Sequence, residues 1–124
     1  MEQKAEYKIS SSMKEGILEI ILTGEESQST FAKMKNEIDN IIINSVAKNV
    51  LIDCHALKGR LGITKTYERV RSHPPEVYKV NIALVDLPEH ADYQNFHETT
   101  ALNAGMRFKW FTDTEAARAW LKSK

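Results

Sequence analysis

The alternation of apolar and polar residues predicts five strands along this chain. The predicted strands are residues 7–12, 17–23, 50–52, 80–85 and 106–111. Gly16 suits a hairpin turn between the first two strands, because such turns favour a residue with positive φ. Residues 20–22 are apolar on both faces, so we expect this strand to be covered on both sides and to end at Gly24.

Apolar residues at helical spacing predict helices after the second, third and fourth strands. The first helix has an apolar stripe, and its charged residues, Asp39 among them, are assigned to solvent. The second helix ends before Pro74, since proline lacks an amide and disfavours helix in the residue before it. In the third helix, residues 91–104, we expect Phe96, Leu102 and the alanines to form the apolar side. The stripe of the first helix consists of Phe31, Met34, Ile38, Ile41 and Ile42.

A fourth helix is predicted at the carboxyl end of the chain. Residues 112–115 read Thr-Asp-Thr-Glu, which is typical of a capping box with Thr112 as the cap. We expect Ala117, Trp120 and Leu121 to form its buried face.

The order of elements predicts an α/β fold. An N-terminal β-hairpin is joined to a mainly parallel sheet, with about four helices packed on it. A length of 124 residues fits one domain with one core, and neither a repeat nor a long linker divides residues 1–124.

Composition narrows the class of protein. With 17 basic and 17 acidic residues there is no net charge, which argues against a nucleic-acid partner. The one cysteine, Cys54, cannot form an internal disulfide and fits a reducing compartment. The first residues are charged rather than apolar, and no apolar run approaches the roughly 20 residues of a membrane helix. We therefore expect a cytoplasmic protein without an integral membrane segment.

The loop after the third strand is the first candidate site, because ligands of open α/β sheets gather at the carboxyl ends of strands. Gly59 and Gly62 allow close approach of the backbone, Lys58 and Arg60 are cationic, and the amides of the next helix are free. This loop could bind an anion, or it could be a plain surface turn with solvated cations. We expect Arg60→Glu to weaken binding and to leave the fold intact.

Two carboxylates and the cysteine are further candidates for chemistry. Asp53 and Asp86 both end strands and could act as paired carboxylates, although capping a loop amide is the commoner role of such residues. Cys54 is adjacent to His55, but neighbours on a strand point to opposite faces, so Cys54 is expected to be a buried residue rather than a reactive thiol.

Metal and cofactor sites have no clear signature in the sequence. His55, His90 and His97 could converge, yet none has the close spacing of metal ligands. No set of residues indicates a catalytic centre or a cofactor. The aromatic residues near the carboxyl end, Phe108, Trp110, Phe111 and Trp120, are assigned to the core rather than to a ligand site.

Two segments resemble a known family. The unit VLIDC…GRLGI and the order of elements resemble the STAS domain of bacterial anti-sigma-factor antagonists. The segment FHETTALNAGMRFKWFTDTEAARAWL is similar to an uncharacterised SpoIIAA-like branch of the STAS/SEC14 type. The residues that carry this similarity are Asn103, Gly105, Phe111, Asp113, Ala116 or Ala117, Trp120 and Leu121.

The resemblance implies a non-enzymatic regulatory module that binds a protein partner, or a copy of itself as a homodimer. The alternative it implies is a carrier or sensor of a small apolar or anionic ligand, with an apolar pocket of the SEC14 type. Classical antagonists present a phosphorylatable serine in the loop after the central strand. Residues 58–62 contain no hydroxyl group, and Thr64 and Thr66 follow them. The candidate ligand- or partner-binding residues are Asp53, His55, Lys58, Gly59, Arg60, Gly62, Thr64 and Asp86.

Overall fold

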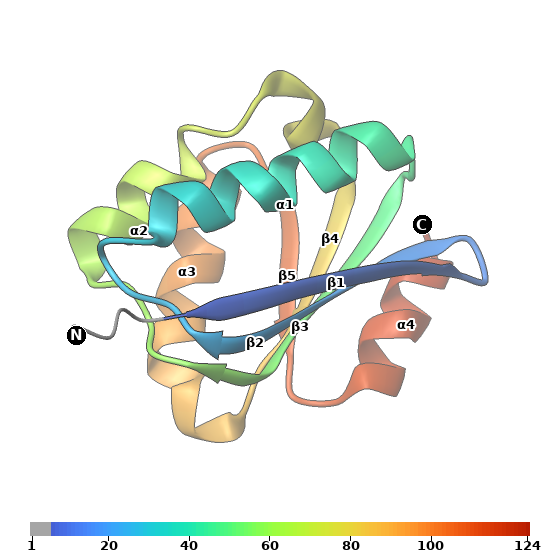
Figure 1. The fold of residues 1–124 in the computed structure, drawn as a ribbon. Helices are drawn as coiled ribbons and strands as arrows, with labels where there is room; N and C mark the ends of the chain where they lie inside the picture. The colour runs from blue at the N-terminus through green and yellow to red at the C-terminus, as the bar shows by residue number, and fades with distance from the viewer. Residues whose placement is uncertain (1–5) are drawn as a thin grey trace.

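The computed structural model describes residues 6–124 and contains one five-stranded sheet (Figure 1). The strands follow one another in space in the order of the chain. The first two strands pair antiparallel, and every later pair is parallel. The predicted α/β fold, a hairpin joined to a mainly parallel sheet, is confirmed. The strands are β1 (Tyr7–Lys14), β2 (Ile17–Glu25), β3 (Asn49–Lys58), β4 (Asn81–Val85) and β5 (Arg107–Phe111).

The hairpin turn lies where the sequence predicts it. Glu15 and Gly16 have φ values of 54° and 79°, the left-handed conformation that two-residue hairpin turns require. The prediction that the second strand ends at Gly24 is wrong, because β2 continues to Glu25. The Glu25 amide donates a hydrogen bond to the carbonyl of Glu6. Ile21 is 40% exposed, so β2 is covered on one side only at this point.

Helices cover the two faces of the sheet unequally (Figure 1). Three helices lie over one face and enclose the larger core, while the last helix lies alone over the other face. The helices are α1 (Phe31–Ser45), α2 (Ile63–Val70), α3 (Ala91–Asn103) and α4 (Thr114–Lys122), with short 3₁₀ turns η1 (Pro75–Lys79) and η2 (Pro88–His90).

The start of α4 differs from the predicted capping box by one residue. Asp113, rather than Thr112, is the cap, and its carboxylate accepts a hydrogen bond from the Ala116 amide at 3.2 Å. Either side chain has an acceptor oxygen, so the sequence pattern alone did not separate the two. Ala117 and Leu121 are fully buried as predicted, whereas Trp120 is only half-buried.

Two helices bury polar residues that the sequence pattern did not place in the interior. Asp39 of α1, assigned to solvent, is 2% exposed. The predicted apolar side of α3 is correct for Ala101, which is fully buried, but wrong for Leu102, which is 50% exposed. The α3 residues that are buried are Gln94, His97, Thr100 and Ala101. Both corrections have one cause: the interior under α1, α2 and α3 contains paired polar groups.

The parallel strands place their carboxyl ends at one edge of the sheet. Glu26 follows β2, Arg60 lies in the loop after β3, and Asp86 follows β4. Three charged residues that are distant in sequence therefore meet at this edge. No helix within residues 6–124 is long and apolar enough to cross a membrane.

Candidate functional site

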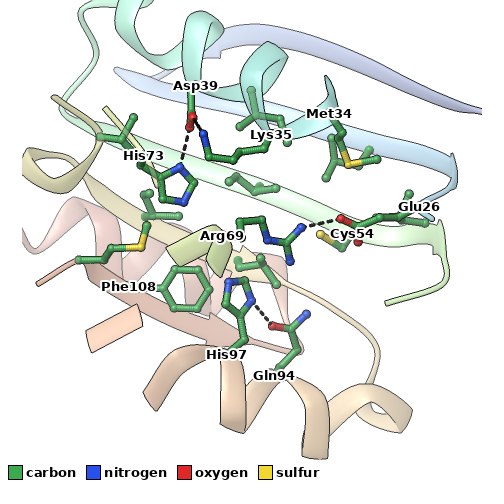
Figure 2. A pocket seen from close by; sticks show the side chains of 18 of the residues that line it. Glu26, Met34, Lys35, Asp39, Cys54, Arg69, His73, Gln94, His97 and Phe108 are labelled. Atoms are coloured by element: carbon green, nitrogen blue, oxygen red, sulfur yellow. Dashed lines mark hydrogen bonds and ion pairs between the residues drawn. The ribbon is translucent and has the colours of Figure 1, made fainter. Parts of the chain in front are cut away.

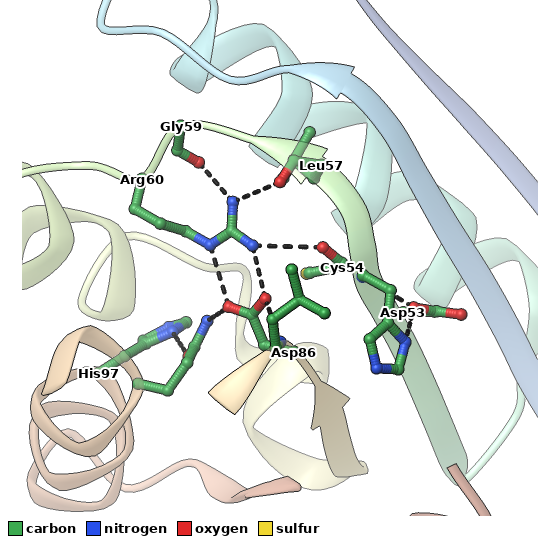
Figure 3. A network of polar contacts seen from close by, with 10 residues as sticks. Asp53, Cys54, Leu57, Gly59, Arg60, Asp86 and His97 are labelled. Atoms are coloured by element: carbon green, nitrogen blue, oxygen red, sulfur yellow. Dashed lines mark hydrogen bonds and ion pairs between the residues drawn. The ribbon is translucent and has the colours of Figure 1, made fainter. Parts of the chain in front are cut away.

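Arg60 fixes the loop between β3 and α2 (Figure 3). Its guanidinium donates two hydrogen bonds to the Asp86 carboxylate, at 3.0 and 2.6 Å. It donates three more to backbone carbonyls, those of Leu57 at 2.8 Å, Gly59 at 2.6 Å and Cys54 at 3.2 Å. An arginine has five N–H donors, so all of them have acceptors here. Arg60 is an internal clamp rather than the accessible loop cation that the sequence suggested.

Asp86 is the acceptor at the centre of this clamp. Its side chain is fully buried and also accepts hydrogen bonds from Gln94 at 2.7 Å and from the Leu87 amide at 2.7 Å. Burial alone would raise the pKa of Asp86, but the hydrogen bonds from Arg60, Gln94 and the Leu87 amide outweigh burial and hold it below its ordinary value. Asp86 is therefore ionised at neutral pH and charge-paired with Arg60.

The remaining candidate residues of this loop lie on the surface. Lys58, Gly59, Gly62 and Thr64 are all exposed. Gly59 has a φ of +80°, and a Cβ there would lie 2.6 Å from the carbonyl oxygen of Glu26, so only glycine fits. Thr66, in contrast, is fully buried.

Asp53 and Asp86 do not form a pair. Asp53 instead accepts hydrogen bonds from the backbone amide of His55, at 2.9 Å, and lies 3.0 Å from its ring Nδ1. Asp53 alternates along β3 with Ile52 and Cys54, which belong to the larger core, so it faces the α4 side of the sheet. Asp86 points toward Arg60. The structure therefore brings together Arg60 and Asp86, and separately Asp53 and His55.

Cys54 is a buried core residue, as the sequence predicts. Burial raises the pKa of its thiol to about 12, so it is protonated at neutral pH. Within residues 6–124, no cluster of three or more histidine, cysteine, aspartate or glutamate side chains could hold a metal ion.

A cavity of about 80 Å³ lies between the sheet and helices α1, α2 and α3 (Figure 2). Its walls are mostly apolar, with Ile52 and Leu84 from the sheet, Met34 and Ile38 from α1, and Phe108 from β5. Polar side chains complete the lining: Glu26, Lys35, Asp39, Arg60, Arg69, His73, Tyr93, Gln94 and His97.

The charged groups around this cavity are paired. Arg69 donates to Glu26 at 2.5 Å and to the Tyr93 hydroxyl at 2.9 Å. On another side of the cavity, Asp39 lies 2.9 Å from the Lys35 ammonium and 2.8 Å from Nδ1 of His73. Pairing offsets the cost of burying these charges.

Sequence reasoning missed several of these lining residues. Asp39, Arg69 and Gln94 were not candidates, because polar residues on an amphipathic helix are normally assigned to solvent. His97 was considered only as a metal ligand. The one available signal was α3 itself, whose apolar residues are too few to form a clear stripe.

The outer side of α2 exposes two large apolar side chains beside the clamped loop. Ile63 is 72% exposed and Tyr67 is 51% exposed, and both lie on one side of the helix because they are four residues apart. The Arg71 guanidinium lies 4.2 Å from the centre of the Tyr67 ring. We call the exposed residues Lys58, Gly59, Gly62, Ile63, Thr64 and Tyr67 the α2 surface.

Comparison with known proteins identifies the fold. No protein-family model matches the chain, and no curated protein matches it in sequence. An anti-sigma factor antagonist from Mycobacterium paratuberculosis matches with a TM-score of 0.65 and 15% identity, over 94% of this chain and 95% of the other. The protein has a STAS-type, SpoIIAA-like fold. An uncharacterised protein of the DUF3478 family from Shewanella loihica, itself described as SpoIIAA-like, matches with a TM-score of 0.61 and 13% identity, over 98% of both chains.

Proposed function

We propose that this protein is a non-enzymatic regulatory module that binds another protein through the α2 surface. The observation that carries the proposal is the pair of exposed apolar side chains, Ile63 and Tyr67, beside a loop that Arg60 holds in place. Apolar and aromatic residues that are exposed together are characteristic of protein interfaces.

The clamp supports this role energetically. A loop that is already ordered loses little conformational entropy on binding, so more of the contact energy appears as affinity. Arg60 anchors the loop to Asp86 of another strand end and to three carbonyls of its own segment. The α2 surface is therefore pre-organised for a partner.

The fold supports a protein as the partner. The structural neighbour from M. paratuberculosis is named as an antagonist of an anti-sigma factor, a role exerted on a protein. In the present chain residues 58–62 offer no hydroxyl group, and Thr66 is buried, so Thr64 is the accessible hydroxyl residue beside them. We place this module in the cytoplasm, where its buried free thiol would remain reduced.

Site-specific photo-crosslinking in cells tests the proposal. A photoreactive phenylalanine analogue is introduced separately at Ile63, at Tyr67 and, as a control, at Leu102, an exposed apolar residue of α3. We expect one protein to be captured from positions 63 and 67 and not from position 102. Equal capture from all three positions, or capture of a second copy of this chain alone, would contradict the proposal.

A second function, a carrier or sensor of a small ligand, is favoured by the cavity under α1, α2 and α3. Native mass spectrometry of the freshly purified protein tests it. A bound small molecule that is lost on denaturation would support a carrier. A spectrum of protein alone would count against a tightly held ligand.

A further inference from the structure

The hydrogen bonds around His97 determine which of its ring nitrogens carries the proton (Figure 3). Asp86 is ionised and can only accept, so the Gln94 group that lies 2.7 Å from it must be the donating NH₂. The Gln94 oxygen is therefore turned toward Nδ1 of His97, at 3.2 Å. Since an amide oxygen can only accept, Nδ1 must carry the hydrogen. The network assigns the neutral Nδ1–H tautomer, and Nε2 is left with a lone pair.

The imidazole is held neutral and in place. Burial lowers the pKa of His97 well below the ordinary value of about 6.5, and the charges of Arg69 and His73 lower it further. The ring packs between Tyr93 and Phe108, with centroid distances of 5.8 and 4.7 Å. Within residues 6–124, Nδ1 is the ring nitrogen that bonds the protein, and the imidazole borders the cavity (Figure 2).

The surroundings of Nε2 favour an uncharged ligand. The cations that line the cavity already have anionic partners: Arg69 with Glu26, Lys35 with Asp39, and Arg60 with Asp86. A carboxylate entering the cavity would lose its hydration without gaining an unpaired cation, and it would meet the lone pair of Nε2. A hydroxyl group, in contrast, can donate a hydrogen bond to Nε2.

The apolar walls and the volume of the cavity limit the polarity and the size of the rest of the ligand. A cavity of about 80 Å³ is smaller than the roughly 150 Å³ of an engineered apolar cavity that binds benzene. Met34 and Met106 line it, and unbranched methionine side chains adapt to the shape of a guest. As it stands the cavity is too small for a six-membered ring, so a single ring is the upper limit for the ligand and enters only when the side chains of Met34 and Met106 move.

We propose that the cavity binds a compact, uncharged molecule with one hydroxyl group on an apolar body, and that the hydroxyl donates its hydrogen bond to Nε2 of His97. This inference rests on the second proposed function, ligand binding in the cavity, and specifies the chemistry of the ligand.

Titration followed by two-dimensional amide NMR tests the proposal with three probes of similar size: phenol, toluene and benzoate. We expect phenol to shift the resonances of α3 and β5 around the cavity, with a dissociation constant at least tenfold lower than that of toluene. Benzoate should leave these resonances unchanged. The variant His97→Phe should bind phenol and toluene equally, whereas the control His90→Phe, outside the cavity lining, should retain the preference for phenol.

A direct measurement on the unmodified protein complements the variants. Long-range nitrogen–proton NMR of the histidine rings should show the Nδ1–H tautomer for His97, and phenol should shift its Nε2 resonance. If toluene binds as tightly as phenol, or benzoate binds more tightly, the hydroxyl assignment is wrong, while ligand binding in the cavity stands. If none of the three probes shifts these resonances, the inference fails. If, in addition, the native mass spectrum shows no co-purified molecule, the second proposed function fails as well.

Discussion

The two faces of the sheet differ in how many polar groups they bury. The α4 face is a small apolar cluster of Ile17, Leu51, Ala83, Val85, Ala117 and Leu121. This face also buries an ion pair between Arg118 and Glu19, whose side chains are 10% and 13% exposed. The opposite face has a larger core, but it also contains the buried pairs of Arg60 with Asp86 and of Arg69 with Glu26, and a cavity.

The apolar groups of the two faces mainly stabilise the fold, whereas the buried polar groups mainly hold other groups in position. Apolar burial under α4 stabilises the fold, but because it is non-directional it does not fix the position of a polar group. A buried ion pair contributes little net stability, because desolvation offsets much of its attraction, but the loss of one partner is costly. The face under α1, α2 and α3 therefore contains the groups whose role is positioning: the clamp of the α2 surface and the imidazole of the cavity.

Arg60→Glu should have the largest effect on this polar face. The change places a second carboxylate against Asp86 in a buried site and removes the donors to three carbonyls. We expect a loss of about 3–5 kcal/mol in the free energy of unfolding, measured by urea denaturation. This reverses the expectation from the sequence that the fold would remain intact. The exposed Lys58→Glu should change it by less than about 0.5 kcal/mol, and equal effects of the two would show that the clamp is not structural.

Leu121→Ala tests the apolar face. Leu121 is fully buried under α4, so truncation should cost about 3 kcal/mol through lost burial and a new cavity. The half-exposed Leu102→Ala is the matched control, with an expected loss below about 1 kcal/mol. Denaturation curves for both variants make the comparison. A loss at Leu121 no greater than at Leu102 would contradict the packing of α4 on the sheet.

The neutral state of His97 predicts a dependence of stability on pH. Its pKa is lower in the folded protein than in the unfolded chain, so the unfolded chain binds the additional proton as pH falls. The contribution of His97 to the free energy of unfolding should be complete above about pH 6.5. It should decline below that pH, by up to about 1.4 kcal/mol per pH unit.

Urea unfolding at pH 7.5 and 5.5 measures this decline. His97→Phe should reduce the difference between the two pH values, whereas His90→Phe should leave it close to that of the unmodified protein. An unchanged difference in His97→Phe would show that another group is responsible.

Ile63→Asp should have the smallest effect on folding and a large one on partner binding. Ile63 is 72% exposed at the first position of α2, where an acidic residue is compatible with the helix dipole. We expect a change of less than about 0.5 kcal/mol in unfolding free energy, together with loss of the protein captured through position 67. Retained capture would separate Ile63 from the binding surface.

The sequence predicted the elements of this fold because their signals are local. Alternation defines β4 and β5, the apolar stripe defines α1, and Gly16 defines the hairpin turn. Each signal depends on residues a few positions apart, which the chain reveals directly. The predicted end of the fourth strand at Val85 is correct and places Asp86 at the edge of the sheet, whereas the predicted end of the third strand before Asp53 is wrong, because β3 continues to Lys58.

Only the tertiary structure decided what these residues do there. Arg60 and Asp86 are 26 residues apart, and Arg69 and Glu26 are 43 apart, so no local pattern shows that they pair. Periodicity assigned Asp39 to solvent and did not select Gln94, because it records polarity and not the presence of a buried partner. The sequence by itself determined which segments form the sheet and its helices. Burial and pairing across the fold determined that Arg60 is a clamp and that His97 faces a cavity as a neutral base.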